Sequence, residues 1–216
     1  MVRKQWQHIL WDWNGTLLAD TQICVDVLNE LMIERGLEPI TAATYRETFD
    51  FPVIEFYRSL GFPTTREDFE ATSHRFITRY NTLAVNCPLH EGAAELLLRF
   101  ADENRRQSIL SAAQQSALEK AMVDYGLSHC FESLVGAENI FAHGKQDRGV
   151  AWIQNSKLDP TEVLLIGDTL HDCKVAQAMG VQCLLVAHGH HSPERLRRTG
   201  CPVVEGIEEL DKWLHS

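Results

Sequence analysis

The spacing of hydrophobic positions divides the chain into two parts with different periodicity. A short buried strand is predicted over residues 7–12, because the residues are apolar and the turn pair Asn14-Gly15 follows. Apolar residues then recur at helical spacing over 23–32, and this helix is expected to end at Gly36. Further helices are predicted over 41–48, 52–60 and 66–83. No strong strand pattern occurs in this stretch, so we expect residues 18–86 to form an all-helical insert.

From Cys87 onward, strand and helix patterns alternate. Strands are predicted near 106–111, 133–136, 162–166 and 182–187. Helices are predicted near 90–103, 114–125, 146–157, 172–179 and 207–214. Such alternation is typical of a parallel sheet with helices on both faces, because each crossover needs a helix to cover the sheet. We therefore predict an α/β fold, with a core formed by residues 1–17 and 87–216 and a helical cap formed by residues 18–86.

Composition narrows the possible partners. The 216 residues carry a formal net charge of −10 and no basic run, which argues against nucleic-acid binding. We expect no membrane span and no signal peptide, because the N-terminal stretch lacks an apolar core and no apolar run is long enough to cross a bilayer. The six cysteines are scattered without a CxxC pair, so we interpret them as small apolar residues. A cytoplasmic protein is predicted.

Chemically active side chains follow the predicted strands. Asp12 ends the first strand, Ser111 ends the second, and Asp168 and Asp172 follow the strand over 162–166. Lys145 lies before a predicted helix. In a parallel sheet the carboxyl ends of the strands share one edge, where ligands bind. The sequence therefore predicts a site that joins carboxylates, a hydroxyl and an ammonium.

Each of these residues also has an ordinary structural interpretation. Asp12 could occupy a turn, and Ser111 could cap a helix. Asp168 and Asp172 could form an acidic first helical turn, and a single lysine such as Lys145 is usually exposed. Their occurrence together, in this order, favours the catalytic interpretation.

The ordered motifs, which span nearly the whole chain, resemble those of the haloacid-dehalogenase superfamily, most of whose members are magnesium-dependent phosphatases. A helical cap inserted after the first strand is similar to the phosphoglycolate-phosphatase and β-phosphoglucomutase branch. The resemblance implies a Rossmann-like parallel sheet and a catalytic Asp12 that attacks a phosphoryl group to form an aspartyl-phosphate. It also implies that Mg²⁺ is held by Asp12, Asp168, Asp172 and the backbone carbonyl of Asn14, since a hard cation prefers oxygen ligands.

The resemblance also supplies a phosphate-binding set. In the family, the hydroxyl at Ser111 donates a hydrogen bond to a phosphoryl oxygen, and the lysine at Lys145 screens the charge of the nucleophile and phosphate. Thr16 is expected to order the first loop, and Thr16 and Ala112 complete the expected set, although many relatives carry asparagine where this chain has Ala112. The turn over 48–52 looks like the cap loop that relatives use for specificity.

Asn14 departs from the phosphatase pattern, because family phosphatases carry an aspartate there as general acid and base. An amide can neither donate nor accept that proton, and a general acid or base contributes about two to four orders of magnitude in rate. Three explanations are open. Another group, of which His171 is the nearest in sequence, supplies the proton. The substrate has a good leaving group, as an acyl or aryl phosphate does. Or the aspartyl-phosphate persists and turnover is slow.

We expect the chain to hydrolyse a small phosphate monoester such as phosphoglycolate, and three other functions are its alternatives. A phosphonatase needs a cap lysine for a Schiff base, and no lysine occurs between Lys4 and Lys120. A haloacid dehalogenase needs no metal, which would leave the Asp168 and Asp172 pair unexplained. A non-catalytic sensor of a phosphorylated metabolite is the alternative that Asn14 motivates.

A histidine cluster and the arginines of the cap are two further candidates for binding. The cluster His188, His190 and His191 has irregular spacing for a zinc site, so we interpret it as loop histidines. Cap arginines could bind a substrate carboxylate, as phosphoglycolate would require. We expect a monomer or homodimer whose partner is a small phosphorylated metabolite.

Overall fold

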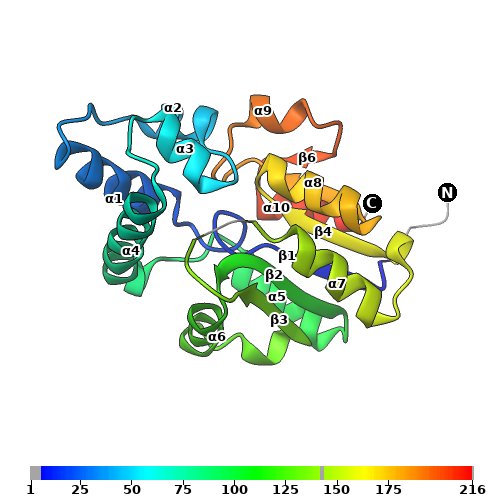
Figure 1. The fold of residues 1–216 in the computed structure, drawn as a ribbon. Helices are drawn as coiled ribbons and strands as arrows, with labels where there is room; N and C mark the ends of the chain where they lie inside the picture. The colour runs from blue at the N-terminus through cyan, green and yellow to red at the C-terminus, as the bar shows by residue number, and fades with distance from the viewer. Residues whose placement is uncertain (1–5, 142–143, 216) are drawn as a thin grey trace.

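A six-stranded parallel sheet forms the centre of the protein (Figure 1). The computed structural model describes residues 6–141 and 144–215. The strands lie in the order β3-β2-β1-β4-β5-β6. Their bounds are His8–Trp11 for β1, Arg106–Gln114 for β2, Ser133–Ala137 for β3, Val163–Gly167 for β4, Gln182–Val186 for β5 and Val203–Val204 for β6. Because β1 lies between β2 and β4, the residues that follow these three strands meet at one edge.

Helices cover both faces of the sheet, as the alternating pattern predicts. The helices of the core are α5 (Ala93–Asp102), α6 (Gln115–Asp124), α7 (Gln146–Ser156), α8 (Leu170–Met179), α9 (Pro193–Arg197) and α10 (Ile207–Leu214). Ile9 and Trp11 of β1 pack in one buried cluster with α5, α6 and α10. Leu10 points to the other face and packs with α7, α8 and α9. This alternation follows from the two-residue repeat of a strand.

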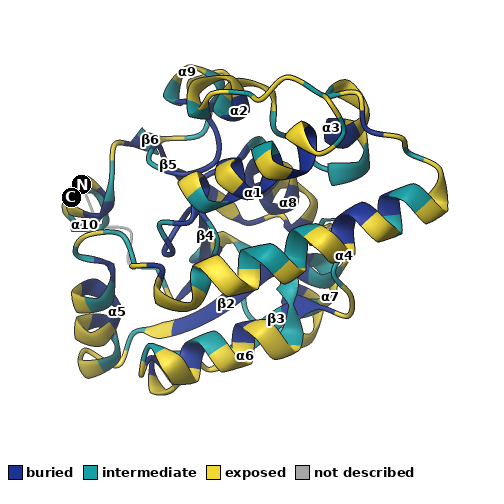
Figure 2. Cartoon of the chain, turned by 90° about the vertical axis from the view of Figure 1, so that its left-hand side faces the viewer, coloured by how far each residue is buried: buried dark blue, intermediate teal, exposed yellow. Residues whose placement is uncertain are grey.

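The stretch between β1 and α5 is helical and has a hydrophobic cluster of its own. It contains α1 (Thr21–Ile33), α2 (Ala42–Thr48), α3 (Val53–Ser59) and α4 (Arg66–Leu83). Their buried apolar residues, among them Leu28, Tyr45 and Phe56, pack mainly against one another. Figure 1 shows these four helices together beside the sheet, and Figure 2 shows exposed residues of α4 alternating with intermediate and buried ones. We refer to α1–α4 as the helical insert.

The predicted α/β fold and all the predicted helices and strands are present, with bounds shifted by a few residues. The sequence analysis missed α9 and β6, which have five and two residues, too few to establish a periodicity. It also missed the three short 3₁₀ helices at Ala84–Asn86, Ser128–Cys130 and Pro160–Glu162. All six cysteines are free thiols. Among the described residues, no helix combines the length and the apolar character that a membrane crossing requires.

His8, the first residue of β1, gives the fold a predictable pH dependence. Its side chain is 1% exposed, its Nε2 lies 3.0 Å from Ser108 Oγ, and its ring packs edge-on against Trp152. Burial lowers the pKa of His8 from 6.5 to about 4. Between pH 6.5 and 4, the unfolded chain binds a proton at His8 that the folded chain does not. The contribution of neutral His8 to the unfolding free energy is therefore present in full above pH 6.5 and is lost as the pH falls towards 4.

We expect His8→Gln to reduce this loss of unfolding free energy between pH 6.5 and 4 by about 2 kcal/mol. Urea unfolding at several pH values measures the change. The control is His129→Gln, since His129 is exposed on the surface. Equal pH dependence for His8→Gln and the wild type would contradict the prediction.

Candidate active site

Three carboxylates converge where β1 and β4 end. One carboxylate oxygen from each of Asp12, Asp168 and Asp172 lies within 4.8 Å of the other two. The Asp12 N–H donates to the Ile166 carbonyl at 2.8 Å, which extends the sheet as far as the first of these residues. The side chain of Asp12 is 12% exposed, while those of Asp168 and Asp172 are completely buried or nearly so. Of the three, only Asp12 borders the large cavity described below.

Local structure fixes both inner carboxylates. Asp172 lies in the first turn of α8 and shares a capping box with Thr169: the Thr169 N–H and hydroxyl donate to Asp172 Oδ2 at 2.9 and 2.6 Å. Asp168 accepts hydrogen bonds from the Thr16 hydroxyl at 2.7 Å and from the His190 N–H at 2.6 Å. Gly15, with φ of +74°, faces Asp168 so closely that a Cβ atom would overlap its carboxylate.

Lys145 supplies a buried positive charge to this group. Its side chain is 2% exposed, and its Nζ lies 2.7 Å from Asp12 Oδ1, 2.6 Å from Asp172 Oδ1 and 3.0 Å from the Leu110 carbonyl. Burial by itself would lower the pKa of Lys145, but the two carboxylates outweigh burial and raise it above the ordinary value. The ammonium therefore stays charged.

One ammonium among three buried carboxylates leaves excess negative charge. Burial raises the pKa of Asp12 to about 7 and that of Asp168 to about 6, in spite of their cationic neighbours Lys145 and His190. A set of hard oxygen donors with excess negative charge fits Mg²⁺ or a similar divalent cation. These residues therefore fit the magnesium site that the sequence predicts.

Ser111 and Ala112 lie near the end of β2 and border the same cavity as Asp12. Ser111 Oγ accepts a hydrogen bond from the Ala113 N–H at 3.0 Å, so its hydroxyl hydrogen remains available to a ligand. Thr16 differs from these two, because its buried hydroxyl is already bonded to Asp168. Thr16 thus supports a carboxylate, although the sequence analysis placed it in the phosphate-binding set.

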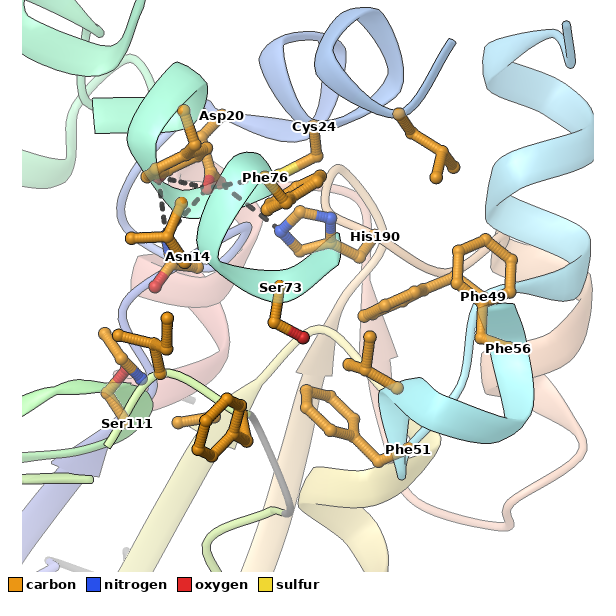
Figure 3. Close-up of a pocket in the computed structure, with 18 of the residues that line it drawn as sticks. Asn14, Asp20, Cys24, Phe49, Phe51, Phe56, Ser73, Phe76, Ser111 and His190 are labelled. Carbon is orange, nitrogen blue, oxygen red and sulfur yellow. Dashed lines mark hydrogen bonds and ion pairs between the residues drawn. The ribbon is translucent and has the colours of Figure 1, made fainter. Parts of the chain in front are cut away.

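Asn14 also borders the cavity, and its amide has a fixed orientation (Figure 3). Its Nδ2 donates to Asp20 Oδ2 at 2.7 Å and to the Tyr80 hydroxyl oxygen at 2.8 Å. Oδ1 is therefore at the opposite end of the amide, away from Asp20. The side chain of Asn14 can accept a hydrogen bond there, but it has no acidic proton to give.

Asp20 was missed by the sequence analysis, where it is an ordinary residue before a helix. It is completely buried and also accepts from the Gly15 N–H at 2.8 Å and the Tyr80 hydroxyl at 2.7 Å, while His190 Nε2 lies 3.3 Å from its Oδ1. Burial would raise the pKa of Asp20, but His190, Tyr80 and Asn14 lower it to about 2. Nothing in the local pattern distinguishes Asp20 from a helix-capping aspartate.

The loop histidines have three separate partners. His190 pairs with Asp20 through Nε2, and its Nδ1 lies 3.1 Å from the Tyr45 hydroxyl. His188 stacks on His90 at 3.6 Å between ring centres, while His191 Nδ1 accepts from the Leu170 N–H at 3.0 Å. The three rings therefore do not converge on one ion. Only His190 belongs to a second possible donor group, with Asp20 and Cys24, in which the Asp20 carboxylate is already fully hydrogen-bonded.

His171, the nearest candidate in sequence for a replacement acid, faces a different way. Its Nε2 accepts a hydrogen bond from the backbone N–H of Lys145 at 3.1 Å, and its ring packs against Phe51 at 4.7 Å between centres. His171 is not among the residues that border the cavity. It supports the loop that carries Lys145.

Known proteins agree with this architecture. The model of the haloacid dehalogenase-like hydrolase family matches residues 9–186. N-acetylmuramic acid 6-phosphate phosphatase of Pseudomonas putida is 25% identical over 190 residues, 86% of this chain and 85% of that protein. Phosphoglycolate phosphatase of Rhodospirillum rubrum is 20% identical over 217 residues, 95% and 90% of the two chains. The solved structure of a haloacid dehalogenase-like family hydrolase from Streptococcus pneumoniae superposes with a TM-score of 0.80 at 19% identity, over 95% of this chain and 97% of that chain.

The buried position of Lys145 leads to a stability prediction. Lys145→Met leaves Asp12 and Asp172 buried without their ammonium, so we expect a loss of about 3–5 kcal/mol in unfolding free energy without metal. Added Mg²⁺ should raise the melting temperature of this variant more than that of the wild type, because the cation replaces the lost charge.

The matched control is Lys120→Met, which removes an ammonium that is 73% exposed and should change stability by less than about 1 kcal/mol. Melting curves with Mg²⁺ and with EDTA measure all three proteins. Wild-type stability of Lys145→Met in EDTA would refute the charge-balance argument.

Proposed function

The chain belongs to the haloacid dehalogenase-like hydrolase family, and we propose that it is a magnesium-dependent phosphatase that acts through an aspartyl-phosphate on Asp12. The observation that carries the proposal is the convergence of three carboxylates and the buried Lys145 ammonium at one edge of the sheet. Asp12 is assigned as the nucleophile because it alone of the three carboxylates borders the cavity.

The residues have separate parts in the proposed reaction. Asp12, Asp168, Asp172 and the backbone carbonyl of Asn14 would hold Mg²⁺, which when bound supplies positive charge to the phosphoryl oxygens. An oxygen of Asp12 attacks phosphorus, and the bond to the leaving oxygen breaks.

Two further residues bind the phosphoryl group as its charge shifts. The Lys145 ammonium, 2.7 Å from Asp12 Oδ1, stabilises the negative charge that builds up beside the nucleophile. The free hydroxyl hydrogen of Ser111 can donate to a phosphoryl oxygen. Water then hydrolyses the acyl phosphate and restores the Asp12 carboxylate.

The substrate class follows from the relatives and the helical insert. The two curated relatives are named for N-acetylmuramic acid 6-phosphate and phosphoglycolate, both small phosphorylated compounds. We therefore infer a small phosphate monoester as substrate here. We also propose that residues 18–86 act as a cap, because their side chains form much of the cavity wall above Asp12.

Phosphate release tests this function. We expect the wild type to hydrolyse at least one member of a panel of phosphate esters and acyl phosphates with Mg²⁺ and none with EDTA. Asp12→Asn should lower the rate by at least about 10³-fold, because it removes the nucleophile. The matched control is Asp102→Asn, an exposed aspartate at the end of α5, which should keep the wild-type rate.

Other results would select other functions. Phosphate release that survives Asp12→Asn would refute the assigned nucleophile. Halide release from a haloacid in EDTA would favour a dehalogenase. A silent wild type, combined with an active Asn14→Asp variant, would favour a phosphometabolite sensor.

A further inference from the structure

The cavity above Asp12 has aromatic walls. It has a volume of about 200 Å³, larger than the roughly 150 Å³ apolar cavity that holds a benzene molecule in another protein. Asp12, Asn14 and Ser111 border it together with aromatic rings from the helical insert. Figure 3 shows Phe49, Phe51 and Phe56 across the cavity from Asn14 and Ser111. The rings of the insert that border it belong to Tyr45, Phe49, Phe51, Phe56, Tyr57, Phe76 and Tyr80. Such walls suit an aromatic group attached to the phosphate.

The cavity has no lysine or arginine among the described residues that border it. The charged groups at its surface are Asp12, Asp20 and His190, and the last two are paired with each other. A second anionic group on the substrate would lose its hydration without gaining a cationic partner. The cavity is therefore unsuited to the carboxylate of phosphoglycolate.

The arginines of the helical insert do not supply the missing cationic partner, because they bind other groups. Arg58 pairs with Glu55 and Arg66 with Glu70, while Arg75 and Arg79 both pair with Glu34. Arg46 donates to the His188 carbonyl at 2.5 Å. The expectation that cap arginines bind a substrate carboxylate thus finds no support in the cavity.

The groups around Asn14 offer no proton to a leaving oxygen. The amide of Asn14 has none to give, and the Asp20 carboxylate beside it accepts all its hydrogen bonds. The hydroxyl hydrogen of Tyr80 is directed at Asp20, to which Tyr80 donates at 2.7 Å. The two ring nitrogens of His190 face Asp20 and Tyr45, at 3.3 and 3.1 Å, so neither is directed at a leaving oxygen.

From the aromatic, cation-free cavity and the amide at position 14 we infer that the substrate is an aryl phosphate, the phosphate monoester of an uncharged phenol. This inference rests on the proposed phosphatase function and names its substrate class. A phenoxide can depart without protonation, because a phenol has a pKa of about 10. An alkoxide is nearly as basic as hydroxide, whose parent water has a pKa of about 15.7. Aromatic walls also suit quaternary ammonium groups, but alcohols that carry one leave as alkoxides.

The reaction balances without a general acid. An Asp12 oxygen bonds to phosphorus, the bond from phosphorus to the phenolic oxygen breaks, and the phenoxide leaves with the electron pair. The phenoxide takes a proton from bulk water. A second water attacks phosphorus, the bond to Asp12 breaks, and both protons of that water leave on dihydrogen phosphate. Asn14 Oδ1 can orient this water but cannot deprotonate it, so the second step limits turnover.

A matched set of substrates tests the inference with the whole chain and Mg²⁺. Phenyl phosphate combines an aromatic ring with a phenoxide, while benzyl phosphate keeps the ring but leaves as an alkoxide. 4-Carboxyphenyl phosphate keeps the phenoxide and adds a charge, and acetyl phosphate has a good leaving group without a ring. In the wild type we expect kcat/KM for phenyl phosphate to exceed that for benzyl phosphate by at least about 100-fold. We expect 4-carboxyphenyl phosphate to be at least about 10-fold poorer than phenyl phosphate.

The variant Asn14→Asp shows how the substrate preference changes when residue 14 can donate a proton. An aspartate at position 14 faces the Asp20 carboxylate, so the two share a proton and residue 14 becomes an acid. The ratio of phenyl to benzyl phosphate should then fall to about 10-fold or less, because the alkoxide can be protonated. With 4-nitrophenyl phosphate, the wild type should release a rapid burst of about one nitrophenol per protein, which Asn14→Asp should abolish.

A pair of phenylalanine variants tests the binding site separately. Phe76→Leu removes a ring from the cavity wall and should raise KM for phenyl phosphate at least about 5-fold, with little effect on acetyl phosphate. Phe62→Leu is the control, since Phe62 is buried in the helical insert but does not border the cavity.

The outcomes separate the inference from the proposed function. Equal wild-type kcat/KM for phenyl and benzyl phosphate would overturn the inference, because some group would then protonate the alkoxide. Turnover of acetyl phosphate without turnover of phenyl phosphate would also overturn it, and would leave the phosphatase function standing. Failure of both the wild type and Asn14→Asp on every substrate would overturn the phosphatase function itself.

Discussion

The attraction between the Lys145 ammonium and the carboxylates of Asp12 and Asp172 is the interaction on which the catalytic edge depends. Without it, three carboxylates that each bring an oxygen within 4.8 Å of the others would repel, and burial would favour their protonation. Strand order brings the acids together, since β1 and β4 are neighbours in the sheet. The lysine comes from the segment before α7 and lowers the pKa of the nucleophile, against the opposite effect of burial.

Asp20 organises a second layer around this edge. Its buried carboxylate collects donors from three parts of the fold: the loop after β1, helix α4 through Tyr80, and the loop after β5 through His190. The same histidine donates its backbone N–H to Asp168. The position of the helical insert is thereby connected to the position of Asp168. A change in α4 can reach the acidic cluster through three contacts: Tyr80 with Asp20, Asp20 with His190, and His190 with Asp168.

The sequence alone predicts most of the fold and much of the acidic site. Long periodic segments such as α4 are predicted closely, and strand ends identify Asp12, Ser111 and Asp168, because strand position and side-chain chemistry are both local signals. The surroundings of Asn14 depend on contacts between distant segments, such as the one between Asn14 and Tyr80, 66 residues apart. No local pattern records such contacts. The aromatic character of the cavity is likewise a property of packing, since a phenylalanine in a helix serves equally well in a core.

The hydrogen bonds at Asp20 also bear on the chemical lifetime of Asn14. An asparagine followed by glycine tends to lose ammonia when the glycine nitrogen attacks the side-chain carbonyl carbon, and the resulting ring opens partly to aspartate. Here the Gly15 N–H and the Asn14 amide are both held by the same carboxylate, at 2.8 and 2.7 Å. The folded chain therefore resists a change that the unfolded chain undergoes freely, which mass spectrometry of the two states would reveal. Aged or partly unfolded protein would gain molecules with an acid at this position, whereas the intact fold preserves the amide.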